Sequence, residues 1–395
     1  MPGPLDGIKV LSFGRVLAGP FASMLLADLG AEVIKIETPR KGDSARANHP
    51  FIGDVSSYFL SVNRGKKSVT VNTRSEKGVQ IIKRLVEQMD ILIENFRPGI
   101  MKKMGLEYEK AKEINPRLIY VSISGFGQYG ANSHRPTYDM VAQGAGGTLS
   151  ITGESSQHPV RVGYSIGDLG AALFAMNATL AALYERERSG EGQYIDISMT
   201  DCQVALCENA CARYFASGEI AQPIGGRHPI HTPFQIFPTK TDSMIVVAHR
   251  RKYWEKLCRI VGREDLTDDP RFKEEETRTK NQPILEDILN EIFRTKTRDE
   301  WFKIFEENGM IYGPVNNIEQ VVHDPHFNER NMFLDVYHSH LGKLKVVGTP
   351  MKFSRTVCDI KKASPDLGEH TEEVLKDKLN LSSEEIGALK AEGVI

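Results

Sequence analysis

Apolar residues recur along the first part of the chain in two alternating patterns, short compact runs and longer helical stripes. Residues 8–13, IKVLSF, form a short apolar run that predicts a buried strand. Pro20 then starts a helical pattern that ends at Gly30, in agreement with the usual positions of Pro and Gly at helix ends. Residues 31–37 form the next predicted strand. This strand–helix–strand order predicts a parallel sheet with right-handed crossovers.

The same alternation continues towards residue 215. A helical stripe ending at Met89 precedes a predicted strand at residues 90–95, and further strands are expected at residues 117–124 and 193–199. A long apolar helix pattern occupies residues 162–190. We therefore expect residues 1–215 to form the first part of a large α/β domain.

The pattern changes at Gly225, where a loop-rich stretch leads to a strand at residues 244–249 and then to charged helices. We expect residues 225–328 to form a smaller α+β domain. Residues 332–395 return to strand and helix patterns and are expected to rejoin the large domain.

Composition and charge narrow the function classes. A net charge of −2 on 395 residues provides no overall field that favours nucleic acid or a membrane surface. The five cysteines are odd in number and sparse, which is typical of a reducing compartment. We see no signal peptide, and Asp168 interrupts the long apolar pattern, so we expect a cytoplasmic protein with no nucleic-acid or membrane partner.

The turn after the first strand carries no nucleotide-binding fingerprint. It contains Gly14 and Gly19 but lacks G-x-G-x-x-G, and Pro20 and Phe21 stand where a P-loop needs Lys and Ser/Thr. A tight turn that packs a helix against the sheet is the simpler interpretation.

The spacing of the Cys and His residues also gives little indication of a metal site. Cys202, Cys207 and Cys211 form no C-x-x-C pair, so buried thiols are expected. His228 and His231 are three residues apart in a Pro-rich loop, where an ordered loop is favoured over metal ligation. We expect no bound metal.

Two basic groups follow predicted strand ends, and strand carboxyl ends form the ligand edge of an open α/β sheet. A solvated surface is the default interpretation of such charges, but two groups on one edge favour a ligand that carries phosphate. The two groups are Arg40, Lys41 and Arg46, and Arg97, Lys102 and Lys103.

Asp168 stands at the start of the long apolar helix. The structural interpretation is a helix cap, which accepts backbone N–H groups at the positive end of the helix. The functional interpretation is a carboxylate nucleophile, which needs an activated acyl partner. Gly167 and Gly170 are expected to leave room for a bulky ligand beside the carboxylate.

Several segments resemble, in order, those of the class III CoA-transferases, the group that includes formyl-CoA and carnitine CoA-transferases. The resemblance covers essentially the whole chain. The matching segments are LAGPFASMLLADLGAEVIKIE, NRGKKSV, ENFRPGIMKKMGL, NPRLIYVSISGFGQYG, YDMVAQGAGG, GDLGAALFAMNATLAAL, DPHFNERNMF and LGEHTEEVL.

The resemblance implies a Rossmann-like large domain built from both termini, a smaller domain between them and an interlocked homodimer. It also implies that Asp168 is the catalytic aspartate, which forms an anhydride with the donor acyl group and then a thioester with CoA. Acyl-CoA is then a substrate, no tightly bound cofactor is expected, and the second substrate is a small carboxylic acid. Succinyl-CoA is the donor expected by analogy.

The family's binding residues map onto this chain one by one. A family arginine near the adenine falls on Thr38, and Arg40 or Arg46 is expected to replace it. The CoA contacts fall on Val16, Val71, Asn95, Phe96, Lys103 and Met104.

The acyl pocket is implied to include Tyr138 and Asp139. Leu17 replaces a family glutamine, which makes the pocket more apolar and favours an acid larger than oxalate or formate. The loop with His228 occupies the region of a glycine-rich loop that covers the active site, and His228 is included among the expected substrate contacts.

Two other functions stay open at this point. The related α-methylacyl-CoA racemases use a His opposite an Asp, but their His falls on Pro136, with His134 two residues away. A non-catalytic acyl-CoA binder would keep the phosphate contacts and would not need Asp168.

Overall fold

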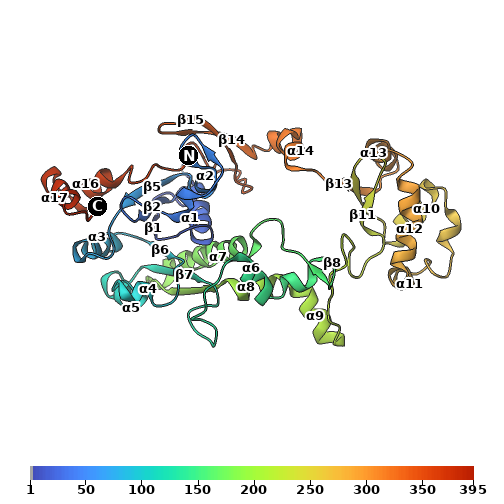
Figure 1. Cartoon of the computed structure of the whole chain (residues 1–395), viewed down its shortest axis with the longest axis horizontal. Helices are drawn as coiled ribbons and strands as arrows, with labels where there is room; N and C mark the ends of the chain where they lie inside the picture. The colour runs from blue at the N-terminus through green and yellow to red at the C-terminus, as the bar shows by residue number, and fades with distance from the viewer. Residues whose placement is uncertain (1–2) are drawn as a thin grey trace. The chain divides into compact units, whose positions relative to one another are not determined.

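The computed structural model describes residues 3–395, which divide into two compact units (Figure 1). The first unit contains the chain up to Thr148, Val162–Gly218 and Pro325–Ile395, and the second contains Leu149–Arg161 and Glu219–Asp324. The sequence pattern places residues 149–161 in the large domain. They belong to the second unit, where the Gly153 carbonyl accepts a hydrogen bond from the Gly225 N–H at 2.8 Å.

A six-stranded parallel sheet forms the centre of the first unit. Its order is β10-β7-β6-β1-β2-β5. Val10 is in register with Val33 on one side and with Ile91 on the other. The strands are β1 (Lys9–Ser12), β2 (Glu32–Glu37), β5 (Lys66–Thr70), β6 (Ile91–Glu94), β7 (Ile119–Ser124) and β10 (Tyr194–Ser198). Parallel strands need both faces covered, which explains their nearly continuous apolar sequences.

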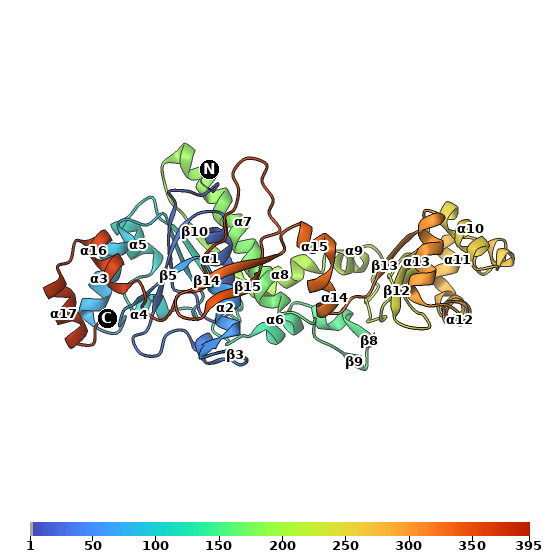
Figure 2. The ribbon, with the colours of Figure 1, turned by 90° about the horizontal axis from the view of Figure 1, so that it is seen from above.

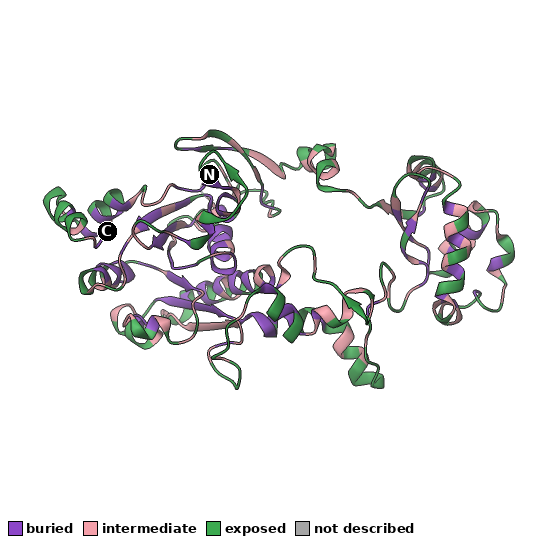
Figure 3. Ribbon diagram, viewed as in Figure 1, coloured by how far each residue is buried: buried purple, intermediate pink, exposed green. Residues whose placement is uncertain are grey.

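Helices cover both faces of this sheet (Figures 1 and 2). One core contains Leu11, Ile34 and Leu92 with α3, α5, α16 and α17, and the other contains Val10 and Val33 with α1, α7 and α8. Burial is concentrated in these strands (Figure 3). The helices are α1 (Ala18–Asp28), α2 (Ser57–Asn63), α3 (Glu76–Val86), α4 (Ile100–Lys103), α5 (Tyr108–Ile114), α6 (Asp139–Ala145), α7 (Ile166–Ser189), α8 (Met199–Leu206), α9 (Glu208–Ser217), α16 (Thr371–Leu379) and α17 (Ser383–Ala391).

The C-terminal segment belongs to the first unit. The Thr371 hydroxyl accepts the N–H of Thr70 at the end of β5, at 3.0 Å, and so joins α16 to the sheet. The remaining elements of this unit are the hairpin β3 (Phe51–Ile52) and β4 (Val55–Ser56), the helix α15 (Pro325–Glu329) and the hairpin β14 (Phe333–His338) and β15 (Gly342–Val347).

The second unit has its own apolar core, which contains Trp254, Phe293, Trp301 and Phe305. An antiparallel sheet of order β11-β12-β13 packs with helices around it. Its elements are β8 (Gly153–Ser155), β9 (His158–Pro159), β11 (Phe234–Pro238), β12 (Ser243–Val247), α10 (Arg251–Ile260), α11 (Glu275–Lys280), α12 (Gln282–Phe293), α13 (Arg298–Glu307), β13 (Ile311–Pro314) and α14 (Ile318–His323).

Helix α7 differs from its sequence-based interpretation. It runs without interruption from Ile166 to Ser189, so Asp168 lies in its first turn and does not break it. By length and composition alone, α7 could cross a membrane, contrary to the expectation from sequence. It packs against α1, α6, α8, β7 and β10 of the first unit.

Candidate active site

The candidate site begins where β1 and β6 lie side by side. The sheet order extends in opposite directions from this pair, and ligands of open α/β folds bind at such switch points, beyond the strand carboxyl ends. Asn95, just after β6, joins the two loops: its Oδ1 accepts the Arg15 N–H at 2.8 Å, and its Nδ2 donates to the Arg15 carbonyl at 3.0 Å. Asn95 therefore holds the Arg15 backbone in place.

The turn after β1 is tight because its two glycines face each other. A Cβ on Gly14 would lie 2.7 Å from the Gly19 carbonyl carbon, and a Cβ on Gly19 would lie 2.8 Å from the Gly14 Cα. Between them, Val16 has a φ of 63°, which is unfavourable for a β-branched residue. The surrounding structure must hold this backbone in place.

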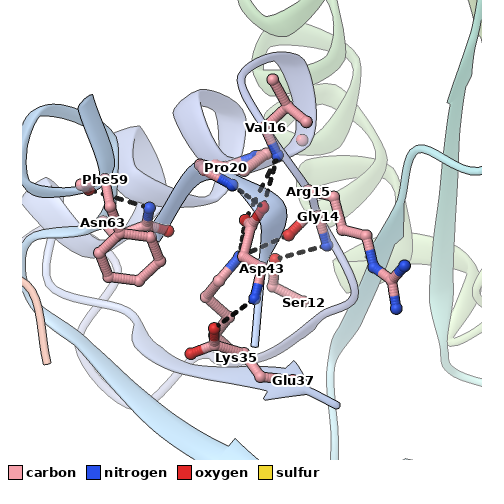
Figure 4. A network of polar contacts seen from close by, with 12 residues as sticks. Ser12, Gly14, Arg15, Val16, Pro20, Lys35, Glu37, Asp43, Phe59 and Asn63 are labelled. Atoms are coloured by element: carbon pink, nitrogen blue, oxygen red, sulfur yellow. Dashed lines mark hydrogen bonds and ion pairs between the residues drawn. The ribbon is translucent and has the colours of Figure 1, made fainter. Parts of the chain in front are cut away.

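A buried ion pair provides that support (Figure 4). The Lys35 ammonium lies 2.8 Å from Asp43 Oδ2 and donates to the Gly14 carbonyl at 2.5 Å. Asp43 Oδ1 accepts the backbone N–H groups of Val16 at 3.1 Å and Ala45 at 3.0 Å. Burial opposes ionisation of Asp43, but the Lys35 charge and these hydrogen bonds keep its pKa below the usual value. The network fixes the strained turn.

Two cavities of about 1120 and 940 Å³ open beside this turn, and Arg15, Thr73 and Arg74 line both. We call them together the basic groove. Such a groove suits the several phosphates of a CoA nucleotide. Its other basic side chains are Arg40, Lys41 and Lys390 in the first cavity, and Lys83, Arg97 and Lys103 in the second.

Arg15 is a groove residue that the sequence did not single out. Its guanidinium donates to the Thr38 hydroxyl at 3.3 Å and lies 5.0 Å from the centre of the Phe96 ring. Thr38 is the position where the family arginine is missing. Arg46 does not fill this place, because its guanidinium binds Glu37 at 2.7 and 2.8 Å. Arg40 is exposed and lines the first cavity, so both it and Arg15 remain candidates.

The other expected CoA contacts fall into two groups. Phe96, Lys103 and Met104 line the second cavity. Val71 is 1% exposed and packs in the core, so its side chain offers no surface there, whereas Thr73 and Arg74 do. Neither of these two residues was identified from the sequence.

Asp168 is half-buried in the first turn of α7. Ser165 occupies the cap position, and Asp168 has no hydrogen bond or ion pair with any residue that the structure describes, so the capping interpretation is wrong. The neighbouring Asp139, at the start of α6, is held on both oxygens: Oδ1 accepts the Gly167 N–H and Oδ2 accepts from Gln143 Nε2, each at 2.8 Å. The Asp139 carboxylate is therefore fixed by hydrogen bonds, whereas the Asp168 carboxylate lacks a partner among the described residues.

The electrostatics of this region place a tyrosine near both acids. Burial, and then the charge of Asp139, raises the pKa of Asp168 to about 7. Burial, followed by the charges of Asp168, Asp43 and Asp139, raises the pKa of Tyr58 to about 12. Tyr58 is thus within electrostatic reach of both the carboxylate pair and Asp43, which holds the Val16 turn.

The glycines beside Asp168 have a different role from the one expected. A Cβ on Gly167 would lie 2.9 Å from Asp139 Oδ1, and a Cβ on Gly170 would lie 3.1 Å from Leu206. They allow α7 to pack closely on α6 and α8. The expectation that they leave space for a ligand is wrong, because protein atoms occupy that space.

The remaining expected substrate residues are more dispersed. Leu17 is buried at the start of α1, while Tyr138 is 75% exposed beside the buried Asp139. His228 lies in the second unit and stacks on Phe234 at 4.8 Å between ring centres. His134 is exposed on the loop before α6.

The cysteines form no disulfide within the described residues. Cys202 and Cys207 are buried, as expected of packing thiols, and Cys211 is partly exposed. Burial raises the pKa of Cys202 to about 11, so this thiol is protonated and unreactive at neutral pH.

Comparison with known proteins identifies the class. The chain matches CoA-transferase family III over residues 5–371, and it belongs to that family. It is 39% identical to human succinyl-CoA:glutarate CoA-transferase, covering 99% of this chain and 90% of the relative. It is 36% identical to the succinyl-CoA–D-citramalate CoA-transferase of Chloroflexus aurantiacus, covering 100% and 98%.

The fold agrees with that family. The crystal structure of a CAIB/BAIF family protein from Brucella suis superposes with a TM-score of 0.87 at 35% identity, covering 96% of this chain and 100% of the other. The chain is therefore a family III CoA-transferase that acts on CoA thioesters.

Proposed function

We propose that this enzyme transfers CoA from succinyl-CoA to a dicarboxylic acid, with Asp168 as the nucleophile. The observation that carries the proposal is the half-buried Asp168 carboxylate, which has no hydrogen bond or ion pair with any described residue and lies in the same unit as the basic groove. A carboxylate with few hydrogen bonds is a better nucleophile than a fully solvated one. Burial in this position supports covalent catalysis.

In the first half-reaction, the Asp168 carboxylate attacks the thioester carbonyl of succinyl-CoA. The CoA thiolate leaves, and a mixed anhydride forms. The thiolate then attacks the Asp168 carbonyl of the anhydride, which releases succinate and leaves an aspartyl-CoA thioester. The basic groove would keep the CoA nucleotide bound throughout.

The second half-reaction reverses these steps with the acceptor acid. The acceptor carboxylate attacks the aspartyl thioester and releases the thiolate, which then attacks the acceptor carbonyl. The acceptor leaves as its CoA thioester, and Asp168 is again a free carboxylate. Backbone N–H groups in the first turn of α7 would stabilise the oxyanions, because the positive end of the helix lies there.

The choice of substrates rests on the relatives. Both relatives named above use succinyl-CoA by name, and their acceptors, glutarate and D-citramalate, are five-carbon dicarboxylic acids. Buried Leu17, in place of the family glutamine, supports an acceptor with an apolar middle section. We therefore propose glutarate and related dicarboxylates as the first acceptors to test.

The active enzyme is proposed to be the interlocked homodimer of this family. Large apolar side chains of the first unit remain exposed around the start of α6 and along α7, which is typical of a surface that a partner covers. They are Tyr138, Met140, Val141, Leu173 and Phe174.

Trapping the covalent intermediate tests the proposal directly. The enzyme is incubated with succinyl-CoA, treated with borohydride and digested, and the peptides are analysed by mass spectrometry. Reduction of an aspartyl thioester converts the Asp168 side chain to that of homoserine. We expect this change at Asp168 with succinyl-CoA and not with free CoA and succinate at low concentration.

Asp168→Asn is the matched control, because it keeps the shape of the side chain and removes the nucleophile. It should lose transfer and trapping but still bind CoA. Full transfer activity in this variant would exclude Asp168 as the nucleophile. Deuterium uptake at the acyl α-carbon without trapping would instead indicate racemase chemistry, and binding alone would indicate an acyl-CoA binder.

A further inference from the structure

A second cluster of reactive side chains lies in the first unit, outside the proposed active site. It consists of His338 at the end of β14, His340 in the following hairpin turn and Asp366 in the loop before α16. One potential ligand atom from each residue lies within 4.8 Å of the other two. We call these three residues the His338 cluster.

His338 is the unusual member. Its side chain is fully buried, and neither ring nitrogen has a hydrogen-bond partner within the described residues. The nearest carboxylate oxygen is Asp366 Oδ1, 3.8 Å from Nε2. A buried polar group without a partner destabilises the fold, so native proteins rarely leave one unsatisfied. This imidazole therefore points to a ligand.

His340 has the geometry of a metal ligand with an outer partner. Its Nδ1 lies 2.8 Å from Asp366 Oδ2, and its Nε2 lies 2.9 Å from Asp54 Oδ1. Histidines that bind a metal through one nitrogen usually donate the other N–H to a carboxylate, which fixes the ring orientation. Asp54, in the turn between β3 and β4, is placed for that role.

Ion pairs alone, without a bound metal, would explain only part of the arrangement of the His338 cluster. A protonated His340 between Asp54 and Asp366 would satisfy those three residues, but both nitrogens of His338 would still lack partners. The adjacent cavity of about 230 Å³ is also lined by Lys66. All three N–H groups of Lys66 donate elsewhere, to the oxygens of Pro20, Val62 and Asn63.

We propose that the His338 cluster binds a zinc-class divalent ion, with His338, His340 and Asp366 as protein ligands and water in the fourth position. Two imidazoles and one carboxylate suit such borderline ions. The ion would join the β3–β4 turn, the β14–β15 turn and the loop before α16. The bound ion would thereby stabilise the packing of the C-terminal segment against the N-terminal part of the first unit.

A second group, His231, His249 and Glu275 in the second unit, meets the same distance criterion. Its surroundings suit a metal less well. None of its three members is fully buried, and only Nδ1 of His249 is buried without a partner among the described residues, whereas both nitrogens of the buried His338 are. This group therefore serves as a comparison in the test.

The test measures zinc binding by the full-length protein after removal of metal with a chelator. Isothermal titration and competition with a chromophoric chelator give the stoichiometry and affinity. We expect one tight zinc ion per wild-type chain, lost in His338→Ala, in His340→Ala and in Asp366→Asn. Asp54→Asn should weaken binding by roughly 10- to 100-fold, the usual effect of losing an outer partner.

Two controls separate this site from adventitious binding. His326→Ala removes an exposed histidine outside both groups, and His231→Ala disrupts the comparison group. Both variants should keep the tight site, and zinc should raise the Tm of wild type but not of His340→Ala. Since His340 is on the surface, its variant is expected to fold even if His338→Ala does not.

Three results would overturn the proposal. They are the absence of a tight zinc site in wild type, unchanged binding in His340→Ala, and loss of the tight site in His231→Ala. Zinc affinity, stoichiometry and Tm are measured without CoA transfer. The test of the zinc site is therefore independent of the proposed function.

Discussion

At the scale of single residues, reactivity depends on what surrounds each charge. Asp43 is buried beside Lys35 and stays ionised, whereas Asp168 is half-buried without a cation in contact, and its pKa rises to about 7. An aspartate carboxylate thus has a structural role at position 43 and is proposed to be reactive at position 168.

The pH dependence of transfer should reflect Asp168. Only the ionised form is a nucleophile, so kcat/KM should fall about tenfold per pH unit below about 7 and level off above it. Asp139→Asn removes the repelling charge and keeps an acceptor for the Gly167 N–H. The acid limb should then move to lower pH, and an unmoved limb would contradict this account.

Stability should depend on pH through the same group. The folded-state pKa of Asp168 lies above its unfolded value near 3.8, so the folded protein binds this proton more tightly. The stability that this proton provides is present below the unfolded pKa and is lost as pH rises towards about 7. Asp168→Asn removes the charge and should raise the unfolding free energy at pH 8 by on the order of 1–2 kcal/mol, with little change at pH 4.

Denaturant titration at a fixed protein concentration measures this difference. Asp139→Asn relieves the same repulsion but replaces the acceptor of the Gln143 amide with a donor, so its gain at pH 8 should be smaller. A variant Asp168→Asn that is less stable than wild type at pH 8 would show that the carboxylate has a stabilising partner.

Binding of CoA should depend on Arg15. Arg15→Ala removes a guanidinium that lines both cavities of the basic groove and contacts Phe96 and Thr38. We expect Kd for CoA to rise about 5- to 30-fold at low salt, equivalent to roughly 1–2 kcal/mol, and the effect to shrink at high salt. Calorimetric titration measures this.

Lys103→Ala should behave in the same way, since Lys103 lines the second cavity. Lys110→Ala, which removes an exposed lysine paired with Glu113 outside the groove, is the charge-matched control. Equal Kd values for Arg15→Ala and this control would remove Arg15 from the site.

At the scale of elements, the site depends on how loops after different strands are held. The Val16 turn follows β1, Asp43 follows β2 and Asn95 follows β6. Hydrogen bonds from Asp43 and Asn95 fix the backbone of the turn. The geometry of the turn therefore depends on the loops after three different strands at the same edge of the sheet.

Asp43→Ala tests this coupling. It leaves the buried Lys35 unpaired and should lower stability by about 3–5 kcal/mol. The double variant Lys35→Met/Asp43→Ala removes both charges and should recover much of that loss. CoA affinity should stay low in both, because the Val16 N–H still lacks its acceptor. Restored affinity in the double variant would show that the ion pair does not position the turn.

At the scale of the whole molecule, the exposed apolar surface of α6 and α7 is expected to be covered by a second chain. Sedimentation should give a particle of twice the 44.1 kDa chain mass. Threaded chains cannot separate without unfolding, so dilution should not produce monomer. A concentration-dependent monomer would rule out interlocking.

The sequence alone determined the α/β class and the family. Strand runs separated by helical stripes predict a parallel sheet, since this pattern requires apolar faces on both sides. The apolar pattern of residues 162–190 placed Asp168 at the start of a helix. The six predicted strands lie within two residues of their observed bounds, because local hydrophobic spacing fixes them, but β5 at the edge of the sheet was not predicted.

Only the tertiary structure decided what each candidate residue contacts. Arg15 and Arg74 join the basic groove because residues after different strands meet at one sheet edge. Asp54, His338 and Asp366 come together although they are far apart in sequence. Gly167 was misinterpreted because its neighbour, Asp139, comes from another helix. Local patterns encode spacing along the chain, whereas contacts between distant segments arise only when the chain folds.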